Sequence, residues 1–586
     1  MKRNNIFKVF AVMALLATGL TSCNDFLTIY PTDKTIGEDF WKTKQDVQNM
    51  VTGAYGSIIS YGCQEKAIVW GGFRSDELVK YSSCVNTSLD NINAVNLLPT
   101  NGYNEWGSFY GVINRCNIVL NHAADVMDLD PSFTQGDYNE VRAQMLALRS
   151  LCYFYLVRTF RDVPYTTQSY EDDDQEMSIP QSAPDSVLQC CIADLEESER
   201  YIMHSGAYGQ GSWKNVGYFT RDAVWALLAD IYLWRASMNH SQADYQKCIE
   251  YADKVIESKD AYYKDTHGAA IASLGNDPYH LLDRDNFFYN IFVLGNSSES
   301  ILEWQYDGRN NSNTALENYY FEEGSSNNHK TTSILMASQV FNFYAENANT
   351  PQGLKAFTTK NDLRYWLNTY GVDNEEATEL PVRKTVTRSY VRIDPTTQKG
   401  GLEKDSRAFD EYNQNWIVYR LTDIMLMKAE ALVQTAASDS DAVTLERAFN
   451  IVQAVNKRAM VKTATDTLLI KDFPNRASME LLVLSERQRE LCFEGKRWYD
   501  LMRYCYRHME GVDSKTKMAD RTDWPALYAP MLRMIVRKYV SGGDAVSYKM
   551  KSEPYLYWPV QESEMKVNKL LKQNPVFHME KSSTKN

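Results

Sequence analysis

The sequence lacks the residue spacings of the commonest metal and redox sites. Its ten cysteines include no CxxC pair, and its eight histidines show neither HxxxH nor HExxH spacing. Zinc sites and zinc proteases need such spacings, because the ligands must converge on one ion. Cys152 and Cys492 lie in apolar helical patterns and are expected to act as small core residues. A dense disulfide framework is not expected in so long a chain, although the cysteine count leaves room for one or two bridges.

Clustered positive charge is absent as well. The formal net charge is −13, and no dense stripe of lysine and arginine occurs. A nucleic-acid-binding surface needs such a stripe to neutralise phosphates, so this class of partner is excluded. Aromatic residues make up 12% of the chain, with 38 tyrosines. This richness suits either packing in a helical core or stacking on sugars.

Only the first residues contain a concentrated apolar run. Lys2, Arg3 and Lys8 precede the apolar residues 9–16, a run about half as long as the roughly 20 residues that span a bilayer. Leu-Thr-Ser-Cys23 follows, similar to the bacterial lipobox, so we expect a signal peptide over 1–22 and lipid attachment at Cys23. Residues 23–37 would then form a tether. An ordinary signal peptide with a chance cysteine is the alternative.

Helical periodicity dominates the rest of the chain and comes in pairs. We expect four pairs, near 38–123, 136–203, 217–258 and 415–460, the first split by a long excursion. Large aromatics facing small alanines in such pairs are typical of tetratricopeptide packing. The predicted fold class is mainly α, an α-superhelical scaffold of about four tetratricopeptide-type pairs with long irregular loops and minor β structure.

Three long segments interrupt the helical pattern. They cover roughly 62–103, 261–345 and 350–412 and are rich in Asn, Ser, Gly, Asp and aromatic residues. Irregular segments of this length inside a compact protein are uncommon and often functional. We expect them to carry a binding face on the helical scaffold.

Six motifs, in order along the chain, carry a family resemblance. They are LTIYPTDK (27–34), YFYLVRTFRDVPY (153–165), SESILEWQYD (298–307), YRLTDIMLMKAEAL (419–432), ERQRELCFEGKRWYDLMRY (486–504) and YLYWPVQESEMKVNKLLKQNP (555–575). With them the chain resembles the SusD/RagB family of outer-membrane nutrient-binding lipoproteins from end to end. It departs from the family pattern at Arg161, where a glycine is usual, and at Trp558, where a leucine is usual.

The resemblance implies a non-catalytic role at the cell surface. Such a protein would be lipid-anchored in the outer membrane, capture an oligosaccharide or polysaccharide, and deliver it to a SusC-like TonB-dependent transporter. It also implies an N-terminal SusD-like region, 38–260, and a C-terminal region, 261–586, packed as one unit. The residues leave other functions open: capture of peptides or another nutrient, a pure interaction scaffold, and, remotely, a surface glycoside hydrolase.

The hydrolase interpretation can be judged from three glutamates that recur every four residues. They are Glu486, Glu490 and Glu494. This spacing places them on one helix face, about 6 Å apart per turn. A glycosidase needs two carboxyls, one of them with a raised pKa. The surrounding cations would instead lower these pKa values, which predicts a structural ion-pair network. Gly495 would let the backbone turn so that Arg497 and Trp498 dock on the scaffold.

Candidate ligand residues lie where aromatic rings stand beside hydroxyl-binding polar groups in the irregular segments. The first choice, residues 69–81, offers Trp70, Phe73, Arg74, Asp76 and Tyr81. The second, residues 303–321, offers Tyr306, Arg309, Asn310, Tyr319 and Tyr320. The third is DNFFYN, residues 285–290. For each aromatic ring in these three segments, the alternative to ligand binding is burial in the core or contact with a transporter.

One acidic stretch, YEDDDQE at 170–176, raises the question of calcium. Clustered carboxylates are the ligands that Ca²⁺ prefers, but the stretch lacks the regular spacing and turn glycine of an EF-hand. A solvated acidic loop is therefore the preferred interpretation, and a structural calcium ion the alternative. No cofactor is predicted.

Overall fold

The computed structural model describes residues 40–577, apart from 173–174, 268–278, 321–333, 344–354, 370, 373–376, 378, 385–388, 394–399, 405–411 and 462–465. The predicted signal peptide, Cys23 and the tether lie outside these residues and stay predictions. Within the described part of the chain, no helix combines the length and apolar character needed to cross a membrane.

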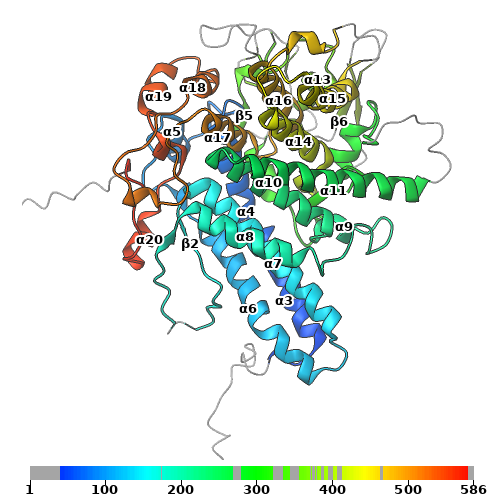
Figure 1. Cartoon of the computed structure of the whole chain (residues 1–586), viewed down its shortest axis with the longest axis vertical. Helices are drawn as coiled ribbons and strands as arrows, with labels where there is room; N and C mark the ends of the chain where they lie inside the picture. The colour runs from blue at the N-terminus through cyan, green and yellow to red at the C-terminus, as the bar shows by residue number, and fades with distance from the viewer. Residues whose placement is uncertain are drawn as a thin grey trace, which may run out of the picture.

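Four helix pairs form the scaffold, as the periodicity predicted. They are α3 (Lys44–Ile58) with α6 (Gly107–Leu129), α7 (Gln135–Phe160) with α8 (Pro184–Ser198), α10 (Arg221–Asn239) with α11 (Gln242–His267), and α14 (Leu421–Thr435) with α15 (Ala442–Ala459). In Figure 1, α10 and α11 lie between the α3, α6, α7 and α8 group and the α14 and α15 pair. The prediction of a mainly helical, tetratricopeptide-like fold is confirmed.

The excursion inside the first pair contains short elements. These are α4 (Tyr61–Ile68), the π-helical turn η2 (Val69–Phe73), β1 (Leu78–Lys80), α5 (Thr87–Asn93) and the 3₁₀ turn η3 (Gly102–Asn104). The other α-helices of the described residues are α9 (Lys214–Gly217), α12 (Thr314–Tyr319), α13 (Leu363–Asn368), α16 (Arg476–Leu491), α17 (Arg497–Arg507), α18 (Ala529–Val536), α19 (Gly543–Lys549) and α20 (Glu562–Val567).

Strands are short and pair in twos across long sequence distances. In the described residues, β1 pairs antiparallel with β5 (Leu335–Ala337), β2 (Val163–Pro164) with β3 (Gln181–Ser182), β4 (Ser300–Trp304) with β8 (Trp416–Arg420), and β6 (Ser389–Ile393) with β7 (Gly400–Lys404). The β4–β8 ladder leads directly into α14. It therefore joins an irregular segment to the last helix pair.

Local signals set the ends of α7. Thr134 and Asp137 form a capping box at its start, which satisfies backbone N–H groups that the first turn leaves without partners. The helix ends at Phe160, before the Asp162-Val163-Pro164 stop. Arg161 adopts a left-handed conformation, φ 66°, which accounts for the glycine usual at this position. Ion pairs to Asp162 and Glu553 hold this arginine in place.

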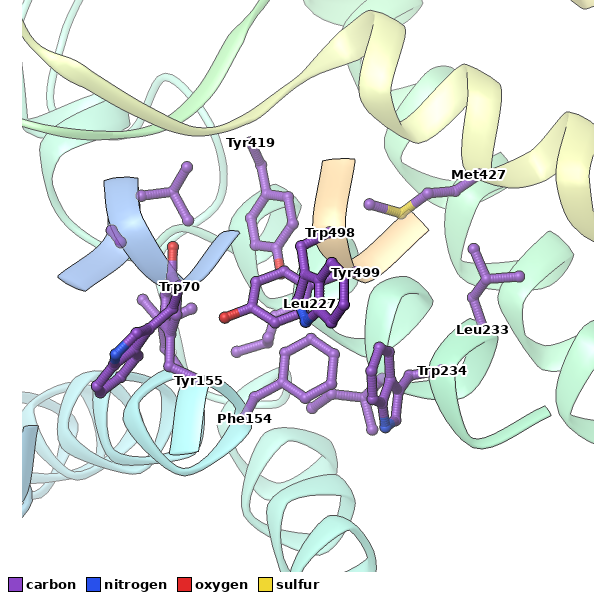
Figure 2. Packing of buried hydrophobic residues seen from close by; sticks show 14 of the residues in the cluster. Trp70, Phe154, Tyr155, Leu227, Leu233, Trp234, Tyr419, Met427, Trp498 and Tyr499 are labelled. Carbon is purple, nitrogen blue, oxygen red and sulfur yellow. The ribbon is translucent and has the colours of Figure 1, made fainter. Parts of the chain in front are cut away.

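One continuous hydrophobic core joins the N-terminal and C-terminal helices. Figure 2 shows rings from well-separated parts of the chain, among them Trp70, Phe154, Trp234 and Tyr499, meeting in one region. Trp234 packs edge-on to Phe154 and Tyr499, an arrangement that aromatic quadrupoles favour. Cys152 and Cys492 are fully buried, as predicted. The nine described cysteines are free thiols.

Candidate functional site

The first predicted ligand segment, residues 69–81, is mostly part of the core. Trp70 and Phe73 are completely buried, and the Trp70 indole Nε1 donates a hydrogen bond of 2.8 Å to the Tyr103 carbonyl. The Arg74 guanidinium is buried over the Trp498 ring, 4.3 Å from its centroid. A ligand at the protein surface cannot touch these three side chains as the structure places them. Half-buried Tyr81 is the one residue of this set at the surface.

The glycines of this segment explain its burial. A Cβ atom on Gly71 would lie 1.8 Å from the Gly495 carbonyl oxygen, and one on Gly495 would lie 2.6 Å from the Ala67 carbonyl oxygen. The π-helical turn η2 therefore packs directly against the backbone between α16 and α17. Gly71 serves a close backbone contact rather than the loop flexibility that an exposed binding segment would use.

Asp76 is likewise a buried structural residue. Its carboxylate accepts hydrogen bonds from Arg497, at 2.8 and 3.2 Å, and also pairs with Arg537. Burial alone would raise its pKa, but these two guanidiniums outweigh burial and hold the pKa well below its usual range. Asp76 therefore stays charged, paired and out of reach of a surface ligand.

The second predicted segment divides between core and surface. Tyr306 and Tyr320 are buried, and their hydroxyls donate hydrogen bonds to the carbonyls of Ile59 (2.9 Å) and Phe493 (3.0 Å). Arg309 and Asn310 are exposed in a turn whose backbone N–H groups donate to Asp307. The Tyr319 ring is buried, but its hydroxyl joins a polar network that reaches the surface.

This network, which we call the tyrosine cluster, consists of Tyr61, Glu65, Asn86, Tyr103, Asn318 and Tyr319. The Tyr103 and Tyr319 hydroxyls lie 2.8 Å apart. The Tyr319 hydroxyl donates to a Glu65 carboxylate oxygen at 2.5 Å, and the Asn86 amide donates to the Tyr103 hydroxyl at 3.2 Å. At the surface end, Asn318, Tyr319 and Glu65 lie close enough to the Tyr61 hydroxyl to influence its pKa.

Tyr61 provides the exposed ring of the cluster. It is the first residue of α4 and is 42% exposed, whereas Glu65 lies one turn further on the same helix. Burial raises the pKa values of Tyr61, Tyr103 and Tyr319, so all three hydroxyls stay protonated at neutral pH. The cluster thus offers an aromatic face beside phenol, amide and carboxylate groups, which is the chemistry that sugar hydroxyls and CH faces require.

Sequence reasoning found this cluster only in part. Tyr319 was among the predicted residues, and Glu65, Asn86 and Tyr103 lie in the irregular segment 62–103 that was expected to carry function. Tyr61 lies one residue before that segment. The signal available was a tyrosine at a helix start with a glutamate one turn later, a pattern too common to identify a site.

The third predicted segment lines an open cleft of about 730 Å³. Asp285 and Asn286 are exposed at its wall, near Lys457 and Arg458 of α15. Phe287 and Phe288 are buried in a small separate hydrophobic cluster. The segment therefore presents polar groups to the cleft, while Tyr289 is half-buried against the same hydrophobic cluster, and its part in ligand binding stays a prediction.

The three glutamates predicted as a structural network form a buried charge cluster. Glu486, Glu490 and Glu494 pair with Arg364, Lys384, Arg420, Arg458 and Arg489. One detail of the prediction is wrong: α16 ends at Leu491, so Glu494 does not continue its helix face. Gly495 turns the chain with φ 68°, and Arg497 and Trp498 are buried against the scaffold, as expected; α17 starts at Arg497.

The pKa values of these glutamates also follow the prediction. Burial by itself would raise the pKa of Glu490, but Arg458, Arg420 and Arg364 outweigh it and hold the pKa well below its usual range. The pKa values of Glu486 and Glu494 are lowered in the same way. A general acid needs the opposite shift, so these carboxylates are unsuited to protonating a glycosidic oxygen.

Among the described residues, no group of three or more His, Cys, Asp and Glu side chains is arranged to hold a metal ion. The acidic stretch 170–176 is only partly described, so its calcium interpretation stays a prediction.

Family comparisons cover both halves of the chain. A family model described as SusD family matches residues 298–577, and a second, described as starch-binding associating with outer membrane, matches residues 25–233. SusD-like protein P38 of Formosa agariphila is 24% identical over 558 residues, 91% of this chain and 97% of that protein. The starch-binding protein SusD of Bacteroides thetaiotaomicron is 25% identical over 293 residues, 47% of this chain and 50% of that protein.

Solved structures share the fold. A SusD homolog from Bacteroides thetaiotaomicron superposes with a TM-score of 0.65 at 16% identity, covering 92% of this chain and 99% of that one. A SusD superfamily protein from Bacteroides vulgatus gives 0.62 at 16% identity, covering 92% and 100%. Together with the two family models and the order of the motifs, these matches lead to one conclusion. The chain belongs to the SusD family.

Proposed function

We propose that the protein is a non-catalytic, cell-surface glycan-binding lipoprotein. It captures an oligosaccharide or polysaccharide and passes it to a SusC-like TonB-dependent transporter in the outer membrane. The observation that carries the proposal is the tyrosine cluster, an exposed ring beside phenol, amide and carboxylate groups on a SusD-family scaffold. The name of the relative SusD, a starch-binding protein, supports glycan as the ligand class.

The membrane attachment is part of the same proposal. The lipobox-like sequence ending at Cys23 supports a lipid anchor, and the description of one matching family refers to association with the outer membrane. Lipid attachment at Cys23 would hold the glycan-binding surface close to a transporter without a spanning helix. Labelling with a radioactive fatty acid tests it: the wild type should incorporate the label and Cys23→Ala should not.

The charge pattern supports binding without catalysis. Glu486, Glu490 and Glu494 are buried and ion-paired with lowered pKa values, and Asp76 is paired in the same manner. Glu65 of the tyrosine cluster accepts a hydrogen bond from Tyr319 and is placed to orient a sugar hydroxyl. We therefore assign the cluster to recognition.

Isothermal titration of the purified full-length protein tests the function. The ligands are starch, mannan, xylan and their hexasaccharides, with casein-derived peptides as the comparison. We expect saturable binding to one polysaccharide class, no release of reducing sugar and no response to peptides. Binding to peptides alone would replace the proposal with peptide capture, and release of reducing sugar would replace it with hydrolysis.

A further inference from the structure

A second exposed aromatic ring lies outside the tyrosine cluster. Trp213 immediately precedes α9 and is 45% exposed. Its ring contacts the edge of Tyr218, with centroids 5.5 Å apart and planes at 71°, and Tyr218 packs in turn on Tyr55 at 4.5 Å. A chain of ring contacts therefore connects the indole to the core and fixes its orientation.

The Trp213 indole packs directly against the backbone of Gly217, which has no side chain. A Cβ atom at this position would lie 2.7 Å from the Trp213 ring and 2.6 Å from Cγ of Gln305. Real Cβ atoms do not approach this closely, so any larger residue would displace one of the two side chains. Gly217 therefore brings an exposed indole and a carboxamide side chain to the same place.

The indole forms one wall of a cleft of about 160 Å³. The apolar wall comes from α3, α7 and β4 and includes Ile59, Leu148 and Trp304, and Gln305 lies at the polar side. A cleft with an apolar wall and a few placed polar groups is the usual form of a small-ligand site.

Gln305 belongs to a group of three surface carboxamides. Its Nε2 donates to Oδ1 of Asn296 at 2.9 Å, and the Asn415 amide nitrogen lies 3.2 Å from Oε1 of Gln305 and 3.4 Å from Oδ1 of Asn296. The same Asn415 nitrogen donates to the buried Glu303 carboxylate at 2.8 Å. We call Asn296, Gln305 and Asn415 the carboxamide group.

The oxygens of this group keep unused capacity to accept hydrogen bonds. The Asn415 amide nitrogen carries two hydrogens, and its shortest contact, to buried Glu303, uses one of them. The other is shared between the Gln305 and Asn296 oxygens, at 3.2 and 3.4 Å. Asn296 Oδ1 also accepts from Gln305 Nε2, so Gln305 Oε1, with two lone pairs, is the oxygen best placed to accept from a hydroxyl donor at the edge of the cleft.

From this geometry we propose a second saccharide subsite, in which Trp213 stacks on the CH face of a pyranose ring and the carboxamide group binds its hydroxyls. Uncharged carboxamides both donate and accept, as sugar hydroxyls require, and the fixed indole supplies the apolar face. The inference rests on the proposed glycan-binding function and extends it to a longer ligand.

The two sites are connected through the backbone. Ile59 lines the Trp213 cleft and precedes Tyr61 of the tyrosine cluster by two residues. Tyr306, the neighbour of Gln305, donates its hydroxyl to the Ile59 carbonyl at 2.9 Å. Because Ile59 lies in the Trp213 cleft and Tyr61 follows it by two residues, we infer that one oligosaccharide lying along the junction of α3 and α4 would contact both sites.

Titration of the full-length protein with maltohexaose, mannohexaose and xylohexaose tests the subsite. We expect Trp213→Ala to weaken binding of the hexasaccharide that the wild type binds by about tenfold, and Trp213→Phe to weaken it less, because a ring remains. Gly217→Ala should reproduce much of the Trp213→Ala loss by displacing the indole. Tyr548→Ala, at an exposed ring (73%) on α19, is the matched control and should bind as the wild type does.

The outcomes separate this inference from the proposed function. If the wild type binds a hexasaccharide and Trp213→Ala binds it equally well, the subsite is refuted while glycan capture stands. If Trp213→Ala lowers transporter co-purification and leaves sugar affinity unchanged, the cleft is a protein contact and the inference is wrong. A wild type that binds none of the three probes would overturn both. Thermal unfolding of each variant shows whether any loss of binding comes from misfolding.

Discussion

The buried charge cluster and the tyrosine cluster use similar chemistry for different purposes. In the buried charge cluster, every glutamate is enclosed by guanidinium or ammonium groups from distant segments, and no face is left for a ligand. In the tyrosine cluster, the same kind of carboxylate, Glu65, lies among protonated phenols that reach an exposed ring. The strongest sequence motif therefore marks a buried structural cluster, and the proposed binding chemistry lies in a segment without a motif.

The largest effect should follow from breaking the buried charge cluster. Glu490 accepts from Arg364 at 2.9 Å and Arg420 at 2.6 Å and also pairs with Arg458. Glu490→Gln leaves buried cations without their counter-charge, which should lower the free energy of unfolding by about 3–5 kcal/mol. Urea denaturation of the wild type and of Glu490→Gln measures this difference in the free energy of unfolding.

The matched control is Glu562→Gln on α20, whose partner Lys566 is exposed. It should change the free energy of unfolding by less than about 0.5 kcal/mol. A loss below about 1 kcal/mol for Glu490→Gln would mean that the cluster does not hold the fold together.

The next effect concerns Trp70, the leading ligand residue predicted from sequence. Because its indole is buried against Phe109 and Phe160, Trp70→Ala should cost about 3–5 kcal/mol of stability. Chemical denaturation measures the free energy of unfolding of Trp70→Ala. Trp213→Ala, which removes an exposed ring, is the variant for comparison. If Trp70→Ala instead kept its stability and lost sugar affinity, the buried placement of this ring would not describe the binding-competent state.

A pH-dependent effect should come from Glu77, which is fully buried beside Asp76. Burial raises its pKa to about 8, against an ordinary value of 4.5. At a pH between 4.5 and about 8, Glu77 keeps its proton in the folded state, whereas the unfolded chain has released it. Stability should therefore fall as pH rises through this window, by about 1.4 kcal/mol for each unit of pKa shift, with the loss complete above pH 8.

Glu77→Gln cannot ionise and should lack this alkaline loss. Urea denaturation of both proteins at several pH values between about 4 and 9 gives the difference curve. Parallel curves for the two proteins would contradict a raised pKa at Glu77.

The smallest stability effect should come from the tyrosine cluster. Tyr61→Ala removes an exposed ring and should change the free energy of unfolding by less than about 0.5 kcal/mol. Affinity for the bound glycan should nevertheless fall by about tenfold. Tyr61→Phe keeps the ring and removes the hydroxyl, so titrating both variants separates stacking from hydrogen bonding. Unchanged affinity in both would place the ligand elsewhere.

Much of the scaffold was predictable because its signals are local. The helix pairs follow from periodicity, and the end of α7 follows from Pro164. The lowered pKa values of Glu486 and Glu490 were expected from arginines nearby in the sequence. Arg489 does pair with Glu486, but the cations on Glu490 are Arg364, Arg420 and Arg458 from distant segments. The early end of α16 was missed, since nothing local distinguishes Glu494 from another helical position.

The binding surface was less predictable because burial depends on distant partners. Trp70 and Tyr61 are both aromatic residues near the same helix, yet one is enclosed by α6 and α7 and the other is exposed. The absence of a side chain at Gly71, directly after Trp70, allows contact with Gly495, more than four hundred residues away in the sequence.

By itself, the sequence determined the helical pairs and the family, because periodicity and motif order are properties of neighbouring residues. It also indicated that the glutamates are ion-paired, although the tertiary structure supplied the cations on Glu490 and Glu494. Only the tertiary structure decided which rings face solvent. It buried Trp70 and Asp76 and brought Glu65 to Tyr319 and Trp213 to Gln305, across gaps in sequence that only chain packing closes. Recognition of a ligand depends on that packing, because an aromatic face is useful to a sugar only where the fold leaves it open.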